Sequence, residues 1–136
     1  MLYHGQGLVH RTNTFYTSGM WDVTFTDQFR DWYASLTDKE QAVIEASVNV
    51  LITDGPNLGR PLVDRIKQST IQNLKELRPP GTSLRILFAF DPRRCAILLL
   101  GGNKARQWQA WYKRTIPVAE ALYAEHLREL EKEGLL

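Results

Sequence analysis

Hydrophobic and polar residues alternate with period two over residues 21–26, which is typical of a half-buried β-strand. Apolar residues then recur at helical spacing as far as Leu36, and this spacing predicts a short helix. The residues Thr37-Asp38-Lys39-Glu40 form a capping box for a second helix, which we expect to continue to about Thr53. The two helices are therefore expected to form a helical hairpin.

Three more strands are expected in the second half of the chain. Residues 73–78 form the first of them. Residues 84–90 and 95–100 are apolar on nearly both faces, as expected for the middle of a sheet that helices cover on at least one side. Short turns separate the three strands, so we predict that they are antiparallel neighbours. The preceding segment 58–70 has no clear pattern and is expected to wrap the edge of the domain.

The C-terminal part is helical, and the sequence leaves two arrangements open. Thr115 and Pro117 suit the cap and first turn of a separate last helix. One long helix with an interior kink at Pro117 is the alternative. Either way the element order is strand, helix, helix, three strands and helix. The chain is therefore expected to be an α+β protein with a small antiparallel sheet.

Composition excludes several classes of protein. The 136 residues are 43% hydrophobic and 24% charged, which is ordinary for a globular protein. The longest apolar run, residues 95–100, is far shorter than the roughly 20 residues of a membrane helix. The first 19 residues lack the apolar stretch of a secretory signal, and Cys95 is the single cysteine. We expect a cytoplasmic protein with no membrane partner.

Positive charge is concentrated in the middle of the chain. Residues 60–114 contain twelve lysines and arginines against three acidic residues, a balance of +9 within a total of +2. Clustered cations attract polyanions, so this region is a candidate nucleic-acid site. The alternative is that the charges lie on different faces of the folded protein.

Patterns for metal or cofactor binding are absent from the sequence. His4, His10 and His126 are far apart, and the glycines form no phosphate loop, nucleophile elbow or dinucleotide fingerprint. We therefore expect neither a metal nor a cofactor.

Arg85 is the most informative basic residue because it interrupts an otherwise apolar strand. Burying an unpaired guanidinium is costly, so Arg85 must reach a carboxylate, solvent or a bound anion. An ion pair with Glu76 on the adjacent strand is the structural alternative to anion binding. For Trp108 and Trp111, packing against the sheet is expected rather than base stacking. Tyr112 is a candidate for proton transfer, because a phenol beside cations can donate or accept a proton.

Several stretches, together with Lys104, resemble RelE/HigB-like toxins of bacterial toxin–antitoxin pairs, especially the phage-derived branch. They are Trp21-Asp22-Val23, Glu76-Leu77-Arg78, Leu84-Arg85-Ile86-Leu87-Phe88 and Leu98-Leu99-Leu100-Gly101-Gly102. The resemblance covers about residues 20–130 and includes the element order. It implies one toxin domain over residues 20–136, preceded by an extension over residues 1–19. It also implies a helical hairpin on one face of the sheet and a basic groove on the other.

The resemblance implies a metal-independent endoribonuclease that cleaves messenger RNA, in many members on the translating ribosome. Arg85 matches the arginine of the family's central strand and would stabilise charge on the phosphate. The proton carriers are less clear, because relatives offer a histidine or tyrosine sooner after the last strand than Tyr112. Glu76 would act as a general base or only orient Arg78 or Arg85. The catalytic candidates are therefore Arg85, Lys104, Glu76 and Tyr112, and the substrate-binding candidates are Lys75, Arg78, Arg106 and Lys113.

Two other functions stay open at this stage. A gyrase-targeting toxin of the same fold would inhibit a protein without cutting RNA. A non-catalytic module would bind nucleic acid or the antitoxin. The resemblance implies a cognate antitoxin as a partner, of the helix-turn-helix type.

Overall fold

The computed structural model describes residues 8–9, 14–15 and 20–136, and these contain one sheet and three α-helices. The helices are α1 (Asp27–Ala34), α2 (Asp38–Asp54) and α3 (Trp108–Lys132), with short 3₁₀ turns η1 (Gly55–Asn57) and η2 (Ala105–Gln107). The strands are β1 (Leu8–Val9), β2 (Thr14–Phe15), β3 (Val23–Phe25), β4 (Val63–Arg65), β5 (Lys75–Leu77), β6 (Leu84–Phe90) and β7 (Ala96–Asn103). The α+β class predicted from the sequence is confirmed.

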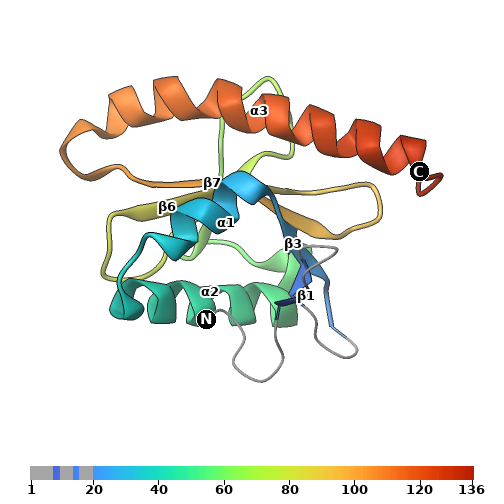
Figure 1. Ribbon diagram of the computed structural model, residues 1–136. Coiled ribbons are helices and arrows are strands. Elements are labelled where there is room, and N and C mark those ends of the chain that lie inside the picture. Colours follow the sequence, from blue (N-terminus) through green and yellow to red (C-terminus); the bar gives the residue numbers. More distant parts are fainter. Residues whose placement is uncertain (1–7, 10–13, 16–19) are drawn as a thin grey trace.

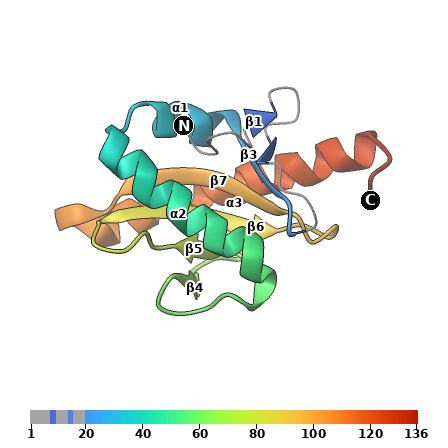
Figure 2. The same cartoon turned by 90° about the horizontal axis from the view of Figure 1, so that it is seen from below.

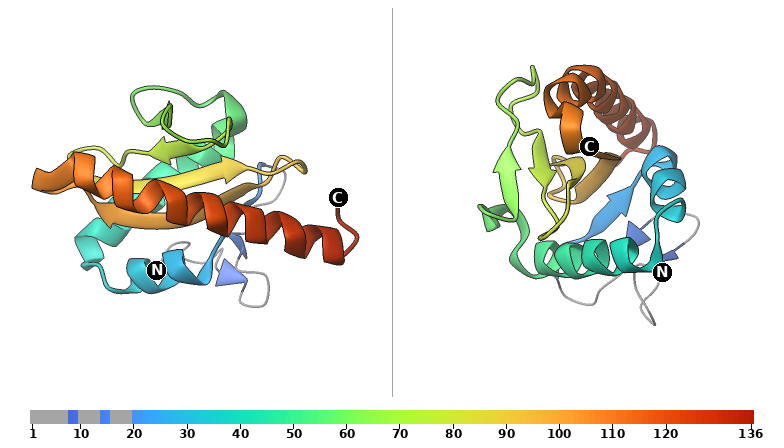
Figure 3. Two further views of the ribbon diagram at one scale, coloured as in Figure 1. Left: turned by 90° about the horizontal axis from the view of Figure 1, so that it is seen from above. Right: turned by 90° about the vertical axis from the view of Figure 1, so that its left-hand side faces the viewer.

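The sheet lies between two layers of helices (Figure 1). Its strand order is β1-β2-β3-β7-β6-β5-β4. Helix α2 crosses one face of the sheet (Figure 2), and α3 runs along the opposite face (Figure 3). Successive side chains of a strand point to opposite faces, so β6 supplies both layers. Ile86 and Phe88 pack with α1 and α2, whereas Leu87 and Ala89 pack with α3.

The helical hairpin forms where the apolar spacing and the capping box predict it. The Thr37 side chain accepts a hydrogen bond from the backbone N–H of Glu40, and the Glu40 side chain accepts one from the backbone N–H of Thr37. Helix α2 ends at Gly55, whose φ of 64° is unfavourable for other residues. A Cβ at Gly55 would also collide with the indole of Trp21. The end of the hairpin is thus fixed by backbone conformation and by packing.

Two features of the sheet differ from the sequence prediction. Strands β5, β6 and β7 are antiparallel neighbours as expected, but β3 pairs with β7 in parallel. The long connection between β3 and β7 allows this direction, which strand patterns alone do not reveal. Strand β7 also continues through Gly101 and Gly102 instead of ending at Leu100. These glycines leave room for the rings of Trp32 and Trp111, which a Cβ at either position would strike.

The segment 58–70 contains a strand that its pattern did not reveal. Strand β4 pairs with β5 and forms one edge of the sheet, which agrees with the prediction that this segment lies at the edge of the domain. With three residues, β4 is too short to display an alternating pattern.

The C-terminal part is one helix with Pro117 inside it, so the prediction of a single long helix is confirmed and that of a separate last helix is wrong. Trp111, Ile116, Ala119 and Tyr123 hold α3 against the sheet. This packing compensates for the backbone hydrogen bond that the proline cannot make.

Strands β1 and β2 continue the sheet beyond β3. They belong to the predicted extension 1–19, and the rest of that extension lies outside the described residues. Within the described residues, no helix combines the length and the apolar character needed to span a bilayer.

The turn between β6 and β7 is built around the buried carboxylate of Asp91. One oxygen accepts hydrogen bonds from the backbone N–H groups of Arg93 (2.8 Å) and Cys95 (3.2 Å). The other oxygen lies 2.9 Å from Arg93 Nη2 and 3.0 Å from His126 Nε2 on α3. Burial alone would raise the pKa of Asp91, but the hydrogen bonds from His126, Arg93 and Cys95 outweigh it and lower the pKa.

Asp91→Asn is expected to lower the free energy of unfolding at pH 7 by about 2 kcal/mol, because Arg93 and His126 lose the buried carboxylate that accepts their hydrogen bonds. The pKa of Asp91 lies below its ordinary value of 3.8 in the folded state. Its stabilising effect is therefore complete above that pH and is lost as the pH falls through the folded-state pKa. Urea unfolding at pH 7 and below about pH 3 tests this. An equal difference between wild type and variant at both pH values would contradict it.

Candidate functional site

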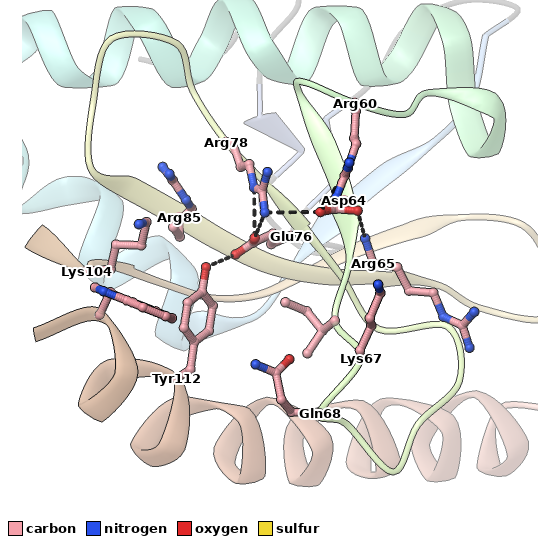
Figure 4. A pocket seen from close by; sticks show the side chains of 12 residues that line it. Arg60, Asp64, Arg65, Lys67, Gln68, Glu76, Arg78, Arg85, Lys104 and Tyr112 are labelled. Atoms are coloured by element: carbon pink, nitrogen blue, oxygen red, sulfur yellow. Dashed lines mark hydrogen bonds and ion pairs between the residues drawn. The ribbon is translucent and has the colours of Figure 1, made fainter.

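A pocket of about 470 Å³ lies on the α3 side of the sheet, where β4, β5 and β6 meet the first turns of α3 (Figure 4). Glu76 lies at the floor of the pocket. It pairs with Leu87 of β6, and paired residues point to the same face of the sheet, which for Leu87 is the face covered by α3. The lining residues come from four parts of the chain and carry mostly polar or charged groups. They are Arg60, Asp64, Arg65, Ile66, Lys67, Gln68, Glu76, Arg78, Arg85, Lys104, Trp108 and Tyr112.

The Glu76 carboxylate is buried, with 3% of its side chain exposed. Its Oε1 accepts a hydrogen bond from the Tyr112 hydroxyl. Its Oε2 accepts from Arg78, at 2.8 Å from Nε and 2.7 Å from Nη2. Both oxygens therefore have partners, and the carboxylate fixes the positions of Tyr112 and Arg78.

Asp64 on β4 extends this network to the edge of the sheet. Its Oδ2 lies 3.2 Å from Arg78 Nη2 and 3.3 Å from Arg60 Nε. The backbone N–H of Arg65 donates to its Oδ1 and lowers the pKa of Asp64, and the two arginines lower it further against the effect of burial. Arg78 loses solvation by burial, but its bond to Glu76 and the charge of Asp64 raise its pKa. Arg78 is thus neutralised by two carboxylates.

Tyr112 is held as a neutral phenol. Burial raises the pKa of Tyr112, and its hydrogen bond to Glu76 together with the negative charge of Glu76 raises it further. Because the hydroxyl donates to Glu76, its lone pairs are available to accept a proton from another group. Tyr112 and Glu76 therefore form a pair through which a proton can pass.

Arg85 does not make the ion pair with Glu76 that the sequence left open. Its Nη1 donates to the carbonyl oxygens of Leu84 (2.7 Å) and Thr82 (3.4 Å), while its Nε is buried with no partner. No carboxylate within the described residues pairs with Arg85. Its positive charge is left without a counter-ion at the wall of the pocket.

Lys104 stands at the entrance of the same pocket. Its Nζ lies 5.7 Å from the centre of the Trp108 ring, within the range of a cation–π contact. Trp108 is 46% exposed, so the prediction that it packs against the sheet is wrong, whereas the same prediction is confirmed for Trp111. Trp108 lies in the first turn of α3, three residues before Trp111, whose ring lies against Gly102 of β7.

Five of the eight candidate site residues line one pocket, namely Arg85, Lys104, Glu76, Tyr112 and Arg78. Their roles stay predictions, but their convergence from distant parts of the chain is observed.

Two other candidates, Lys75 and Lys113, lie elsewhere. Lys75 precedes Glu76 on β5 and points to the opposite face, where its Nζ lies 3.4 Å from the Pro56 carbonyl. Lys113 lines a neighbouring groove. Arg106 lies in η2, and its side chain is outside the described part of the chain.

The chain matches the family model described as phage derived protein Gp49-like over residues 31–124. This protein belongs to the Gp49-like family. Two relatives come from Mycobacterium tuberculosis. "Putative toxin HigB3" is 50% identical over 98 residues, which cover 72% of this chain and 86% of the relative. "Putative toxin HigB2" is 45% identical over 103 residues, which cover 74% of this chain and 51% of the relative, so this chain spans about half of that protein.

The resemblance to HigB-like toxins is thus confirmed. The whole pocket falls within the Gp49-like match, since its lining residues lie between Arg60 and Tyr112.

Sequence analysis missed the contribution of the segment 58–70 to this Gp49-like pocket. Arg60, Asp64, Arg65, Lys67 and Gln68 all line it, although the segment had no readable pattern. The basic residues of this segment could have indicated its place in the site. Strand β4 pairs with β5, so these residues lie close to Arg78. Within the described residues, no three His, Cys, Asp or Glu side chains are grouped as metal ligands.

The loop between β4 and β5 brings Lys67 and Gln68 to the pocket, and α3 anchors it (Figure 1). Glu120 Oε2 accepts hydrogen bonds from Ser69 Oγ (2.6 Å), Thr70 N (2.7 Å) and Thr70 Oγ1 (3.0 Å). The bond from Ser69 is the main cause that lowers the pKa of Glu120. One carboxylate oxygen thus fastens the loop to the helix.

Glu120→Ala is expected to release this loop of the Gp49-like domain and to lower stability by about 1 kcal/mol, because the three donors lose their acceptor. Hydrogen exchange should become faster at Thr70 and the neighbouring amides while the core amides stay protected. Glu125→Ala, on an exposed position of the same helix, is the matched control. Equal exchange in both variants would show that Glu120 does not hold the loop.

Proposed function

We propose that this protein is the toxin of a toxin–antitoxin pair and acts as a metal-independent endoribonuclease on messenger RNA. The two relatives are toxins by name. The observation that carries the enzymatic part is the arrangement of Arg85 and Lys104, two cations with no carboxylate partner within the described residues, beside the Tyr112–Glu76 pair. Such a pocket suits a phosphodiester, which offers anionic oxygens and a hydroxyl proton.

In the proposed reaction, Arg85 and Lys104 bind the non-bridging oxygens of the scissile phosphate. Negative charge on these oxygens grows as the phosphorus is attacked, and fixed cations in a partly buried site stabilise that charge. A guanidinium suits this role because it presents parallel N–H donors to a phosphate. Arg78 is neutralised by Glu76 and Asp64, so its part is to orient Glu76 at the floor of the pocket.

The attacking group is the 2′-hydroxyl of the RNA. Its oxygen forms a bond to phosphorus while its proton passes to Tyr112, and the Tyr112 proton passes to Glu76. The bond between phosphorus and the 5′-oxygen breaks, and the Lys104 ammonium protonates the 5′-oxygen. The products are a 2′,3′-cyclic phosphate and a 5′-hydroxyl end. Every step uses groups of this chain and of the RNA.

A cognate antitoxin of the helix-turn-helix type would neutralise the toxin, and the translating ribosome would present the messenger RNA in the cytoplasm. Both follow from the proposed toxin function rather than from a contact seen in this chain. Co-expression of the neighbouring gene product should restore growth if that product is the antitoxin.

Mapping of RNA 5′ ends after induction of the full chain in a bacterial host tests the proposed function. We expect new 5′-hydroxyl ends inside coding regions. Cleavage by the purified protein, with ribosomes added where needed, should continue in EDTA at concentrations that spare the ribosome. Growth arrest with broken chromosomes and no new RNA ends would replace this proposal with the gyrase-targeting function.

A further inference from the structure

A second hollow of about 480 Å³ adjoins the candidate active site. It lies between α3 and the loop that Glu120 holds, and it shares Gln68, Trp108 and Tyr112 with the first pocket. Figure 4 shows Gln68 and Tyr112 among the side chains that line the first pocket. Beyond the shared residues, its walls include Ile116 and Pro117 of α3. The two hollows therefore adjoin along these three shared residues.

The two hollows differ in chemistry. The first is lined by four arginines and two lysines. The second has one lysine and one glutamate, Lys113 and Glu120, beside the apolar surfaces of Ile116 and Pro117 and the amides of Gln68 and Gln109. A nucleotide has the same two parts, an anionic phosphate and a planar base with an apolar face and a polar edge. Trp108 stands at the junction, 46% exposed, with the ammonium of Lys104 over its ring.

We propose that this groove is a base-recognition subsite, which holds the nucleobase next to the scissile phosphate. The inference rests on the proposed function, because the phosphate must occupy the first pocket. The base stacks on the exposed indole of Trp108 and covers Ile116 and Pro117, since every nucleobase has a face that stacks on an aromatic ring. The amides of Gln68 and Gln109 carry donors and acceptors, and these select among bases by their edges.

The contact between Lys104 and Trp108 links the two parts of this site. The cation that binds the phosphate also rests on the ring that stacks the base, so a nucleotide bound across the junction contacts both. Because the groove adjoins the cationic pocket, RNA is favoured over a peptide as the occupant. A docking segment of a protein partner is the competing occupant, and the test distinguishes the two.

The experiment compares RNA cleavage maps of the full chain with those of Gln68→Ala, Gln109→Ala and Trp108→Leu. Wild type is expected to prefer particular bases at one position beside the cut. A glutamine variant should relax this preference roughly tenfold while it still cleaves, because it loses contacts to a base edge. Trp108→Leu should lower cleavage roughly tenfold at all sequences, and Trp108→Phe should restore most of it, because the phenyl ring still stacks.

Val118→Ala is the matched control, since Val118 is an exposed residue of α3 that lines neither hollow. Thermal unfolding of each variant identifies losses that come from misfolding, and Trp108→Phe keeps the test valid if Trp108→Leu does not fold. Wild-type cleavage levels and base preference in all groove variants would overturn the subsite. Groove variants that cleave RNA normally but are no longer neutralised by the antitoxin would also overturn the subsite, because the groove would then bind protein. Failure of wild type to cleave RNA would instead overturn the proposed function, and the subsite with it.

Discussion

Replacing Arg85 with alanine is expected to abolish growth inhibition and to lower RNA cleavage at least about 100-fold. Arg85 is the cation with a buried, unpartnered Nε and no carboxylate partner within the described residues, so its charge is available to a phosphate. Removing it takes away stabilisation that increases as the transition state forms. Cleavage rates of the purified variant, together with growth after induction, measure the effect.

The fold should survive this substitution. The Arg85 guanidinium bonds to the carbonyls of Leu84 and Thr82, so its loss is expected to change the free energy of unfolding by no more than about 1 kcal/mol. Arg128→Ala removes an exposed arginine of α3 that does not line the pocket and should leave toxicity unchanged. A stably folded, fully toxic Arg85→Ala protein would contradict the role of Arg85 and leave the pocket without its main phosphate ligand.

The hairpin and the central strands could be predicted because their signals are local. The capping box of Thr37 and Glu40 fixes the start of α2, and the apolar run of β6 needs a position between two layers of helices. The parallel pairing of β3 with β7 could not be predicted, since it depends on where a distant strand returns. The continuation of β7 through Gly101 and Gly102 depends on the rings of Trp32 and Trp111, which come from two helices.

The candidate site was predictable in its charges and less so in its contacts. Arg85 drew attention because a guanidinium in an apolar strand needs a partner, but sequence does not tell which carboxylate reaches which cation. Glu76 pairs with Arg78, two residues along the chain, and with Tyr112, 36 residues away. Lys75 was expected to join Arg78 in binding phosphate, but strand alternation turns its side chain to the other face of the sheet.

The buried hydrogen-bond network of Glu76 is expected to contribute little to the free energy of unfolding, because burying the carboxylate is itself unfavourable. Desolvating a carboxylate is expensive, and buried ion pairs are frequently no better than apolar packing of the same volume. A chain selected only for stability would gain as much from leucine at this position in the sheet. The network holds a phenol, an arginine and a second carboxylate in fixed positions at the wall of a cationic pocket, which is an arrangement suited to proton transfer.

Tyr112→Phe is the direct test of that arrangement, and it is expected to lower cleavage about 100-fold. The substitution removes one oxygen and leaves the ring, so in the proposed reaction the proton of the 2′-hydroxyl loses its acceptor while the cations stay in place. Binding of an RNA that carries a 2′-deoxy nucleotide at the cut should change much less than the rate. Single-turnover cleavage and equilibrium binding, measured on the same preparation, separate the two effects.

Tyr123→Phe is the matched control. Tyr123 is another tyrosine of α3 with a hydrogen-bonded hydroxyl, which lies 3.4 Å from the Phe90 carbonyl oxygen. It is buried and lines no part of the candidate site. Both variants lose one hydroxyl, so a loss of about 1 kcal/mol in stability is expected in each. Only Tyr112→Phe should lose activity. If the two variants cleave equally well, the proton of the 2′-hydroxyl does not pass through Tyr112, and the Tyr112–Glu76 pair serves only to build the wall of the pocket.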